Sequence, residues 1–409
     1  MDLELRTIGA GEVGAFVDSL SVPFLDAGDP TVREHWGPHV EPDRAWAVVE
    51  HGRFVANACA FTRNVTVPGS APGCCPTLPI AAVSGVGVHP THRRRGLLRR
   101  LMGALIDDAR RRGEPLAGLQ ASEGAIYGRF GFGQATWSAQ VVVDTSRAAL
   151  ASPVPGAGVR LLDAHEAAKT LPDLHDRLRR GRAGEVDRDA ATWAGILADP
   201  IPWRKGGSAL YYAVSDDGYA AYRGHELRDN GALVGARLEL RDLYATTAEA
   251  EAALWRYLFD VDLVREVSAL HRPVDDALRW RLVDPRQFRV TLQRDMLWLR
   301  ILDVAAALEA RGYRREGRLV LEVVGDDPEV AGRWRLDASR AGASCRRAAP
   351  GEPAGVTLPI AELGAVYLGG VTPSTLAAAG RVVEGRKGAL DLADSLFATV
   401  PAPFSGTLF

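Results

Sequence analysis

The residues of this chain best suited to chemistry form a short basic turn, Arg93-Arg94-Arg95-Gly96. A helix that begins just after such a turn leaves its first backbone N–H groups without intrahelical partners, and its dipole is positive at that end. Anionic oxygens bind at helix starts for these reasons, and arginine adds fixed charge and bidentate donors. The turn therefore predicts a site for a pyrophosphate.

The residues on both sides of the turn predict the elements that would position it. Val83, Val86 and Val88 are β-branched and indicate a strand, while Gly85 and Gly87 mark a bulge or a close approach of another molecule. Apolar residues then recur with helical spacing over 97–106, and a short apolar strand follows at 116–120. A parallel strand-helix-strand crossover would place the helix start at the carboxyl ends of the strands, where such folds bind ligands.

Bulk composition limits the class of protein. The chain has 409 residues, 47% hydrophobic and 24% charged, with a formal net charge of −2, which is typical of a soluble globular protein and unlike a general nucleic-acid binder. Its acidic start has no apolar signal core, and no run is long enough to span a bilayer, so we expect a cytoplasmic protein. Its four cysteines have neither a disulfide framework nor metal-ligand spacing, so we expect no metal site.

The chain divides into three expected units, 1–150, 151–293 and 294–409. The first holds the basic turn and a hairpin around His51-Gly52, and a Pro/Gly-rich linker follows at 151–158. The second repeats the layout of the first, but residues 245–251 replace the basic turn with an acidic helix start that has no glycine. We therefore expect a duplicated fold with one working nucleotide site. The pattern of the third unit predicts an α+β domain, with helices on one face of an antiparallel sheet.

Two longer strings resemble a known family. Residues 89–98, His-Pro-Thr-His-Arg-Arg-Arg-Gly-Leu-Leu, resemble the acetyl-CoA-binding loop of the GNAT N-acetyltransferases, with Leu98 where the general pattern has Gly or Ala. Together with residues 121–133, Ala-Ser-Glu-Gly-Ala-Ile-Tyr-Gly-Arg-Phe-Gly-Phe-Gly, they are similar to the Eis (enhanced intracellular survival) branch, over the whole chain. The resemblance implies an α+β fold of tandem mixed α/β GNAT domains followed by a sterol-carrier-protein-like domain. It also implies a homohexamer and acetyl-CoA as co-substrate.

The same resemblance implies roles for individual residues. The proton donor matches Tyr127, the proton acceptor is the terminal carboxylate on Phe409, and Asp26 and Trp36 line the acceptor pocket. The family's penultimate position can carry an acidic side chain that favours polycationic antibiotics, whereas this chain has Leu408, a departure that bears on aminoglycoside acetylation. The positions implied for acetyl-CoA are Val86, Gly87 and Val88 on the pantetheine arm, Arg94, Arg95, Gly96, Leu97, Leu98 and Arg99 around the pyrophosphate, and Ser122 and Glu123 beside the cofactor.

The chemistry of acetyl transfer to an amine fits these residue types. A tyrosine, with a reference pKa of about 10, keeps its proton at neutral pH and can donate to a thiolate whose acid has a pKa of about 8.5. A backbone N–H in the glycine-interrupted strand could polarise the thioester carbonyl. An α-carboxylate, with a reference pKa of about 3.3–3.7, needs burial or a bridging water to act as a base.

The sequence thus predicts an acetyl-CoA-dependent N-acetyltransferase acting on a primary amine of the polyamine, lysine or aminoglycoside type. Another interpretation is a non-catalytic acyl-CoA or lipid-binding carrier or sensor, based on the sterol-carrier-like third unit. Each of these residues also has a purely structural interpretation. The arginine run could be a solvated helix face, Tyr127 a packing aromatic, and Phe409 a residue that seals a hydrophobic groove.

Overall fold

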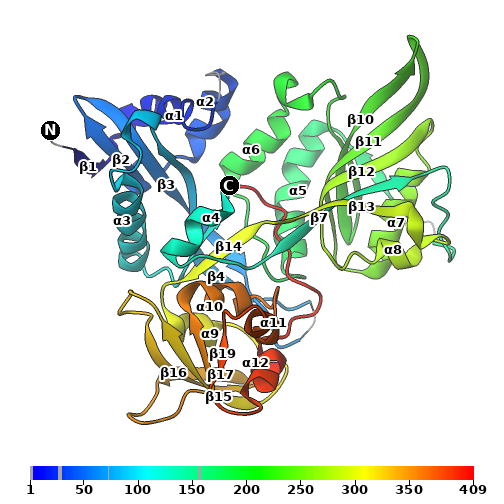
Figure 1. The fold of residues 1–409 in the computed structure, drawn as a ribbon. Coiled ribbons are helices and arrows are strands. Elements are labelled where there is room, and N and C mark those ends of the chain that lie inside the picture. Colours follow the sequence, from blue (N-terminus) through cyan, green and yellow to red (C-terminus); the bar gives the residue numbers. More distant parts are fainter. Residues whose placement is uncertain (1–2, 26–29, 72, 155–157) are drawn as a thin grey trace.

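Three β-sheets organise the chain in the computed structural model, which describes residues 3–25, 30–71, 73–154 and 158–409. Each sheet is the centre of one lobe, and the carboxyl-terminal segment runs from the third lobe up between the other two (Figure 1). Among the described residues, no helix is both long and apolar enough to cross a membrane. Nor does this part of the chain hold a group of three or more His, Cys, Asp or Glu that could bind a metal.

The first sheet has seven strands in the order β1-β2-β3-β4-β5-β14-β6. The expected hairpin is present, since Glu50 pairs with Arg53 and the two turn residues, His51 and Gly52, have φ of +50° and +73°. The elements are β1 (Glu4–Thr7), β2 (Ala45–Glu50), β3 (Arg53–Thr66), β4 (Thr77–Val88), β5 (Leu116–Gln120), β14 (Leu297–Ile301) and β6 (Gly133–Gln134), with helices α1 (Val13–Leu20), α2 (Pro30–Trp36), α3 (Leu97–Arg111) and α4 (Gly124–Tyr127).

The second sheet also has seven strands, in the order β13-β7-β12-β11-β10-β9-β8. Its core includes the buried side chains of Leu254, Trp255 and Leu258, from the helix that follows β11. The elements are β7 (Trp137–Asp144), β8 (Arg160–Leu162), β9 (Tyr211–Ser215), β10 (Gly218–Asp229), β11 (Ala232–Ala245), β12 (Val264–Arg272) and β13 (Phe288–Asp295), with helices α5 (Ala164–Arg179), α6 (Ala190–Ala198), α7 (Ala248–Phe259) and α8 (Leu278–Arg281).

The two sheets exchange strands across the expected unit boundaries at 150 and 294. Strand β7 lies before residue 150 but pairs with β12 and β13 in the second sheet. Strand β14 lies after residue 294 but is inserted between β5 and β6 in the first sheet. A strand's alternating pattern specifies which face is buried but not which edge it joins, so the sequence does not report this exchange.

The third sheet, in the order β17-β16-β15-β18-β19, is mixed and not antiparallel as expected, because β15 and β18 run parallel. Its core contains the buried rings of Tyr313, Trp334, Tyr367 and Phe397. The elements are β15 (Gly317–Val324), β16 (Gly332–Ser339), β17 (Gly342–Arg347), β18 (Val356–Pro359) and β19 (Val383–Glu384), with helices α9 (Val304–Ala310), α10 (Ile360–Tyr367), α11 (Pro373–Ala378) and α12 (Ala389–Phe397).

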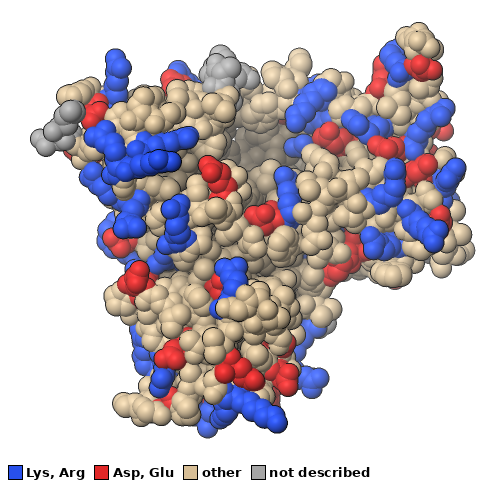
Figure 2. All heavy atoms as spheres, in the orientation of Figure 1, with Lys and Arg blue, Asp and Glu red and all other residues tan. Residues whose placement is uncertain are grey.

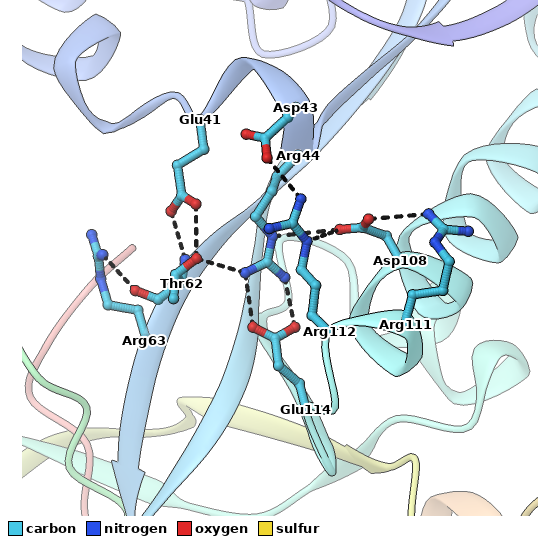
Figure 3. A network of polar contacts seen from close by, with 9 residues as sticks. All are labelled: Glu41, Asp43, Arg44, Thr62, Arg63, Asp108, Arg111, Arg112 and Glu114. Carbon is cyan, nitrogen blue, oxygen red and sulfur yellow. Dashed lines mark hydrogen bonds and ion pairs between the residues drawn. The ribbon is translucent and has the colours of Figure 1, made fainter.

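A buried arginine ties helix α3 to the first sheet (Figure 3). The Arg44 guanidinium donates to both carboxylate oxygens of Glu114, at 2.8 and 2.6 Å, and to the Thr62 hydroxyl at 2.8 Å. Its Nε lies 3.6 Å from an oxygen of Asp108, in the last turns of α3. Both ends of the segment from α3 to β5 are thereby held against β3.

We expect Arg44→Met to lower the free energy of unfolding by about 3–5 kcal/mol, because it leaves the Glu114 carboxylate buried without its partner. Urea denaturation measures this loss. The matched control is Arg33→Ala, which breaks an ion pair to Asp18 that is more than half exposed on the arginine and should cost less than about 1 kcal/mol. Equal losses for the two variants would contradict the assignment.

Candidate functional site

Strands β4 and β5 run parallel but separate soon after they meet. They pair over three positions, the last being Ala82 with Gly118, while β4 continues to Val88 along β3. A register shift sets two β4 residues, Gly85 and Val86, opposite one β3 residue, which is a β-bulge of the kind the glycine predicted. Gly85 has φ of +57°, a conformation that glycine adopts without strain. The edge of β4 beyond residue 82 therefore faces an opening and not β5.

Helix α3 begins at this opening, directly after the basic turn. Its N-cap is Gly96, with φ of +77° and no side chain to bond the first N–H groups. Arg94 is also left-handed, at φ of +61°, which costs a non-glycine residue roughly 1–2 kcal/mol. The N–H groups of the first helical turn are thus left for an external acceptor, and the turn is held in a strained form that presents them.

A cavity of about 1110 Å³ lies between the end of β4, the start of α3 and helix α4, and we call it the α3 cavity. It brings together nearly all of the residues that were predicted to hold the cofactor and to donate the proton. The predicted residues that line it are Val86, Gly87, Val88, Arg94, Gly96, Leu97, Leu98, Arg99, Ser122, Glu123 and Tyr127.

Three of the predicted residues that the structure describes, Arg95, Trp36 and Phe409, do not line the α3 cavity. Arg95 lies outside its wall, with its guanidinium 3.5 Å from Glu50, because successive residues of the turn point in different directions. Trp36 lies on another side of β4, where its ring takes the space that a Cβ at Gly85 would need. Asp26 falls outside the described residues, so its predicted place in the acceptor pocket is not addressed.

Tyr127 ends helix α4 and is 6% exposed. Burial raises the pKa of its hydroxyl, Glu123 acts in the same direction, and a hydrogen bond with Ser122 acts against it. The hydroxyl is therefore protonated at neutral pH and can donate a proton inside the cavity. The Phe132 ring packs edge-on at 6.4 Å between centroids and fixes the orientation of the tyrosine.

Part of the α3 cavity wall comes from segments that are distant in the sequence and were not predicted to line it. Arg300 on β14 donates to the carbonyl oxygen of Phe130 and pairs with Asp327. Pro23 lies against Gly87, where an added Cβ would approach its ring carbons to 3.1 Å. Arg300 carried no sequence signal because it lies far from the motifs along the chain and reaches the cavity only through the strand exchange.

The corresponding place in the second lobe is filled by the protein itself. The hydroxyl of Thr247 caps α7, accepting a hydrogen bond from the N–H of Ala250. The buried guanidinium of Arg272 lies nearby and donates to Glu251 at 2.9 Å, to Asp276 at 2.6 Å and to the carbonyl oxygen of Leu243. This acidic, internally paired helix start would repel an anion, in agreement with the expectation from residues 245–251.

Residues 401–409, which we call the tail, run from the third lobe to the place where the chain ends between the other two lobes (Figure 1). The backbone N–H groups of residues 402, 404 and 406 each donate a hydrogen bond to another part of the protein. Ala402 donates to the Asp275 carboxylate at 2.7 Å, and Phe404 donates to the carbonyl oxygen of Ala183 at 2.9 Å. Gly406 donates to the Glu185 carboxylate at 2.8 Å. At the end of β5, the side chain of Gln120 donates to the carbonyl of Thr407 at 2.9 Å.

The end of the tail packs against apolar clusters of two lobes. Phe409 is half-buried and packs against the cluster on which Trp36 also packs and against the core of the third lobe. The tail residue Thr407 is fixed at the end of β5, two residues before Ser122 on the wall of the α3 cavity. The tail therefore ends next to the segment that carries Ser122 and Tyr127.

Glu185 is the buried group on which the tail depends. One of its carboxylate oxygens accepts from the Gly406 N–H and from the Tyr244 hydroxyl at 3.1 Å. Burial raises the pKa of this carboxyl to about 7, even though Arg188, the Gly406 amide and Tyr244 all act to lower it. Asp242 also faces Glu185 and is paired with Arg188 at 2.5 and 3.0 Å. The tail is therefore docked on a carboxyl that titrates near neutrality.

The free energy of unfolding should fall as the pH rises from about 4.5 to about 7. Glu185 binds its proton more tightly in the folded protein than in the unfolded chain, because its pKa is raised from 4.5 to about 7, so raising the pH through this window costs roughly 3 kcal/mol of stability from this group. Urea denaturation across this pH range measures the loss. Glu185→Gln keeps an acceptor oxygen without a titrating proton and should flatten this dependence; the same slope in both proteins would rule Glu185 out.

Comparison with known proteins assigns this architecture. Two families, each described as an acetyltransferase (GNAT) domain, match residues 4–135 and 184–301, and the sterol carrier protein domain matches 304–406. An uncharacterized N-acetyltransferase of Streptomyces avermitilis is 37% identical over all of this chain and 99% of its own length. The N-acetyltransferase Eis of Mycobacterium tuberculosis is 36% identical over 92% of each chain. The crystal structure of Eis1 from Mycobacterium abscessus superposes with a TM-score of 0.88 at 33% identity, over the full length of both chains.

These matches confirm the predicted family, the tandem GNAT fold with its sterol carrier domain, and the prediction of an enzyme. The chain belongs to the Eis family of GNAT N-acetyltransferases.

Proposed function

We propose that the enzyme transfers an acetyl group from acetyl-CoA directly to a primary amine, with Tyr127 as the acid and the α-carboxylate of Phe409 as the base. The observation that carries the proposal is the α3 cavity itself, which joins the start of α3 to the buried hydroxyl of Tyr127 in one continuous space. A pyrophosphate at the helix start and a thioester near the tyrosine would be two ends of the same ligand.

The first step needs the cofactor held and its carbonyl polarised. The free N–H groups at the start of α3 and the exposed side chains of Arg94 and Arg99 are suited to pyrophosphate oxygens. The unpaired edge of β4 at residues 86–88 offers backbone N–H groups to the pantetheine amides and the thioester oxygen.

The transfer then moves three protons. The amine nitrogen forms a bond to the acetyl carbon, the carbon–sulfur bond breaks, and the departing thiolate takes its proton from the Tyr127 hydroxyl. The proton that the new amide nitrogen loses restores the Tyr127 hydroxyl. The proton lost by the acceptor's ammonium goes to the carboxylate of Phe409, a residue whose partly buried ring packs against the same apolar cluster as Trp36. A negative charge at that place also attracts the cationic acceptor.

Removing either proton-transfer group should lower turnover without loosening acetyl-CoA. We expect Tyr127→Phe to reduce kcat about 100-fold or more, measured as thiol release with a panel of primary amines. Adding one glycine after Phe409 keeps the ring and moves the carboxylate, and should have a comparable effect. Phe409→Ala keeps the carboxylate and is the control. No turnover by the unmodified enzyme with any amine would reject the proposed function and favour a carrier or sensor of acyl-CoA.

The arginines of the basic turn should differ in their effect on the acetyl-CoA KM, because their side chains point in different directions. Arg94→Ala and Arg99→Ala each remove a cation from the α3 cavity and should raise the acetyl-CoA KM about 10- to 100-fold, the value of a charge-assisted hydrogen bond. Arg95→Ala, which loses only its contact with Glu50, should leave that KM unchanged. Steady-state kinetics at fixed acceptor concentration test the contrast, and three equal effects would place the pyrophosphate elsewhere.

A further inference from the structure

The third lobe packs directly against the turn that follows Tyr127. Its helix α10 lies against β14 and β6 of the first sheet (Figure 1), and the third lobe abuts the first, whereas a hollow separates the two upper lobes (Figure 2). Two glycines of the turn allow this close approach. A Cβ at Gly133 would lie 1.8 Å from the carbonyl oxygen of Ala361. A Cβ at Gly131 would lie 3.0 Å from the side chain of Ile360.

Arg300 anchors the turn. It lies on β14 and is 8% exposed. One terminal nitrogen of its guanidinium donates to the carbonyl oxygen of Phe130, and the other pairs with the carboxylate of Asp327. The turn is closed on itself, because the N–H of Phe132 donates to the carbonyl oxygen of Tyr127 at 3.2 Å. An anchor on Phe130 therefore also holds the backbone of Tyr127.

Asp327 holds Arg300 from the third lobe. It lies in the loop between β15 and β16, and its side chain is 9% exposed. The carboxylate oxygen that accepts from Arg300 also accepts from Arg110, in the last turn of α3, at 2.5 Å. The guanidinium of Arg347 fixes the loop by donating to three of its carbonyl oxygens. One mostly buried carboxylate of the third lobe thereby joins α3 to the turn that carries Tyr127.

The two contacts of Arg300 suit a residue that sets the place of another. Arginine presents its donors in a rigid planar fork, so binding a carbonyl and a carboxylate at once fixes the relative position of both, which the point charge of a lysine on its flexible stem does not do. A general acid must lie within hydrogen-bond distance of the atom that takes its proton, and a displacement of about 1 Å can cost about 100-fold in rate.

We propose that the third lobe supports the proton donor of the first, and that Asp327 is a positioning residue that acts on Tyr127 through Arg300. The sterol carrier domain is then part of the acetyl-transfer machinery, although no residue of it has to touch the acetyl group. The inference rests on the proposed function, in which Tyr127 is the acid.

The first test measures kcat on the full-length enzyme, as thiol release with the fastest acceptor among spermidine, Nα-acetyl-lysine and neomycin. Asp327→Asn keeps an acceptor oxygen but removes the charge that holds Arg300, and should lower kcat about tenfold. The acetyl-CoA dissociation constant, from isothermal titration, should change by less than about threefold, because the basic turn is untouched.

The matched control is Asp337→Asn. Asp337 is also a carboxylate of the third lobe shared by two arginines, Arg318 and Arg335, but it is not part of the α3 cavity wall. This variant should leave kcat unchanged. Equal losses of kcat in the two variants, or a loss in Asp327→Asn that lies wholly in the dissociation constant, would overturn the inference.

The second test repeats Asp327→Asn in a Tyr127→Phe background, where there is no proton donor left to position. The residual kcat should then stay within about twofold, and a further tenfold loss would overturn the inference by showing a general structural role. A Tyr127→Phe enzyme that keeps its full kcat would instead count against the proposed function.

Arg300→Lys repeats both measurements if Asp327→Asn does not fold. It keeps a cation beside Asp327 but not the fork that also reaches Phe130, so kcat should again fall about tenfold and only when Tyr127 is present. An unchanged kcat in Asp327→Asn and Arg300→Lys, or a failure of both to fold, would overturn the inference.

Discussion

Two parallel strands that share only three residue pairs determine what the rest of this protein can do. If β4 and β5 remained paired to their ends, the backbone N–H and C=O groups of β4 at residues 86–88 would be hydrogen-bonded to β5 and closed to a ligand. The bulge at Gly85 turns β4 away from β5, and α3 begins where the strands part. The cavity, the buried tyrosine and the docking place of the tail all border the same gap. The gap interrupts the first sheet between β4 and β5. Strand β4 stays in the sheet because it pairs with β3 on both sides of its bulge.

The local parts of this arrangement could be predicted from the sequence, because their signals lie within a few residues. A change from β-branched to helical spacing, with arginines and a glycine between, located β4, the turn and α3, and the apolar run at 116–120 located β5. Tyr127, which the motif match singled out as the proton donor, lies on the wall of the cavity. Side-chain direction within the turn was not predictable, and Arg95 shows why: adjacent residues of an irregular turn have no period that assigns them a side.

The non-local parts could not be predicted for a different reason. Arg300 enters the cavity wall on a strand that belongs by sequence to a later unit, and Glu185 meets Gly406 across more than two hundred residues. Such contacts depend on which edge each strand joins and on where the tail crosses, and neither leaves a local pattern. The partners of charged residues in the two GNAT lobes were equally unpredictable. Arginine side chains are exposed at the start of α3, whereas the Arg272 side chain is buried against carboxylates in the second lobe.

The exchange of β7 and β14 has a consequence for the order in which the protein can be made. A ribosome releases β1 to β6 early, yet the place between β5 and β6 stays empty until residues 297–301 have been synthesised, after the whole second lobe. Pairings so distant along the chain are slow to form, and the open edge of β5 is exposed to other chains in the interval. The first lobe therefore cannot be completed before the second has been synthesised, and the tail, synthesised later still, docks after both lobes are complete.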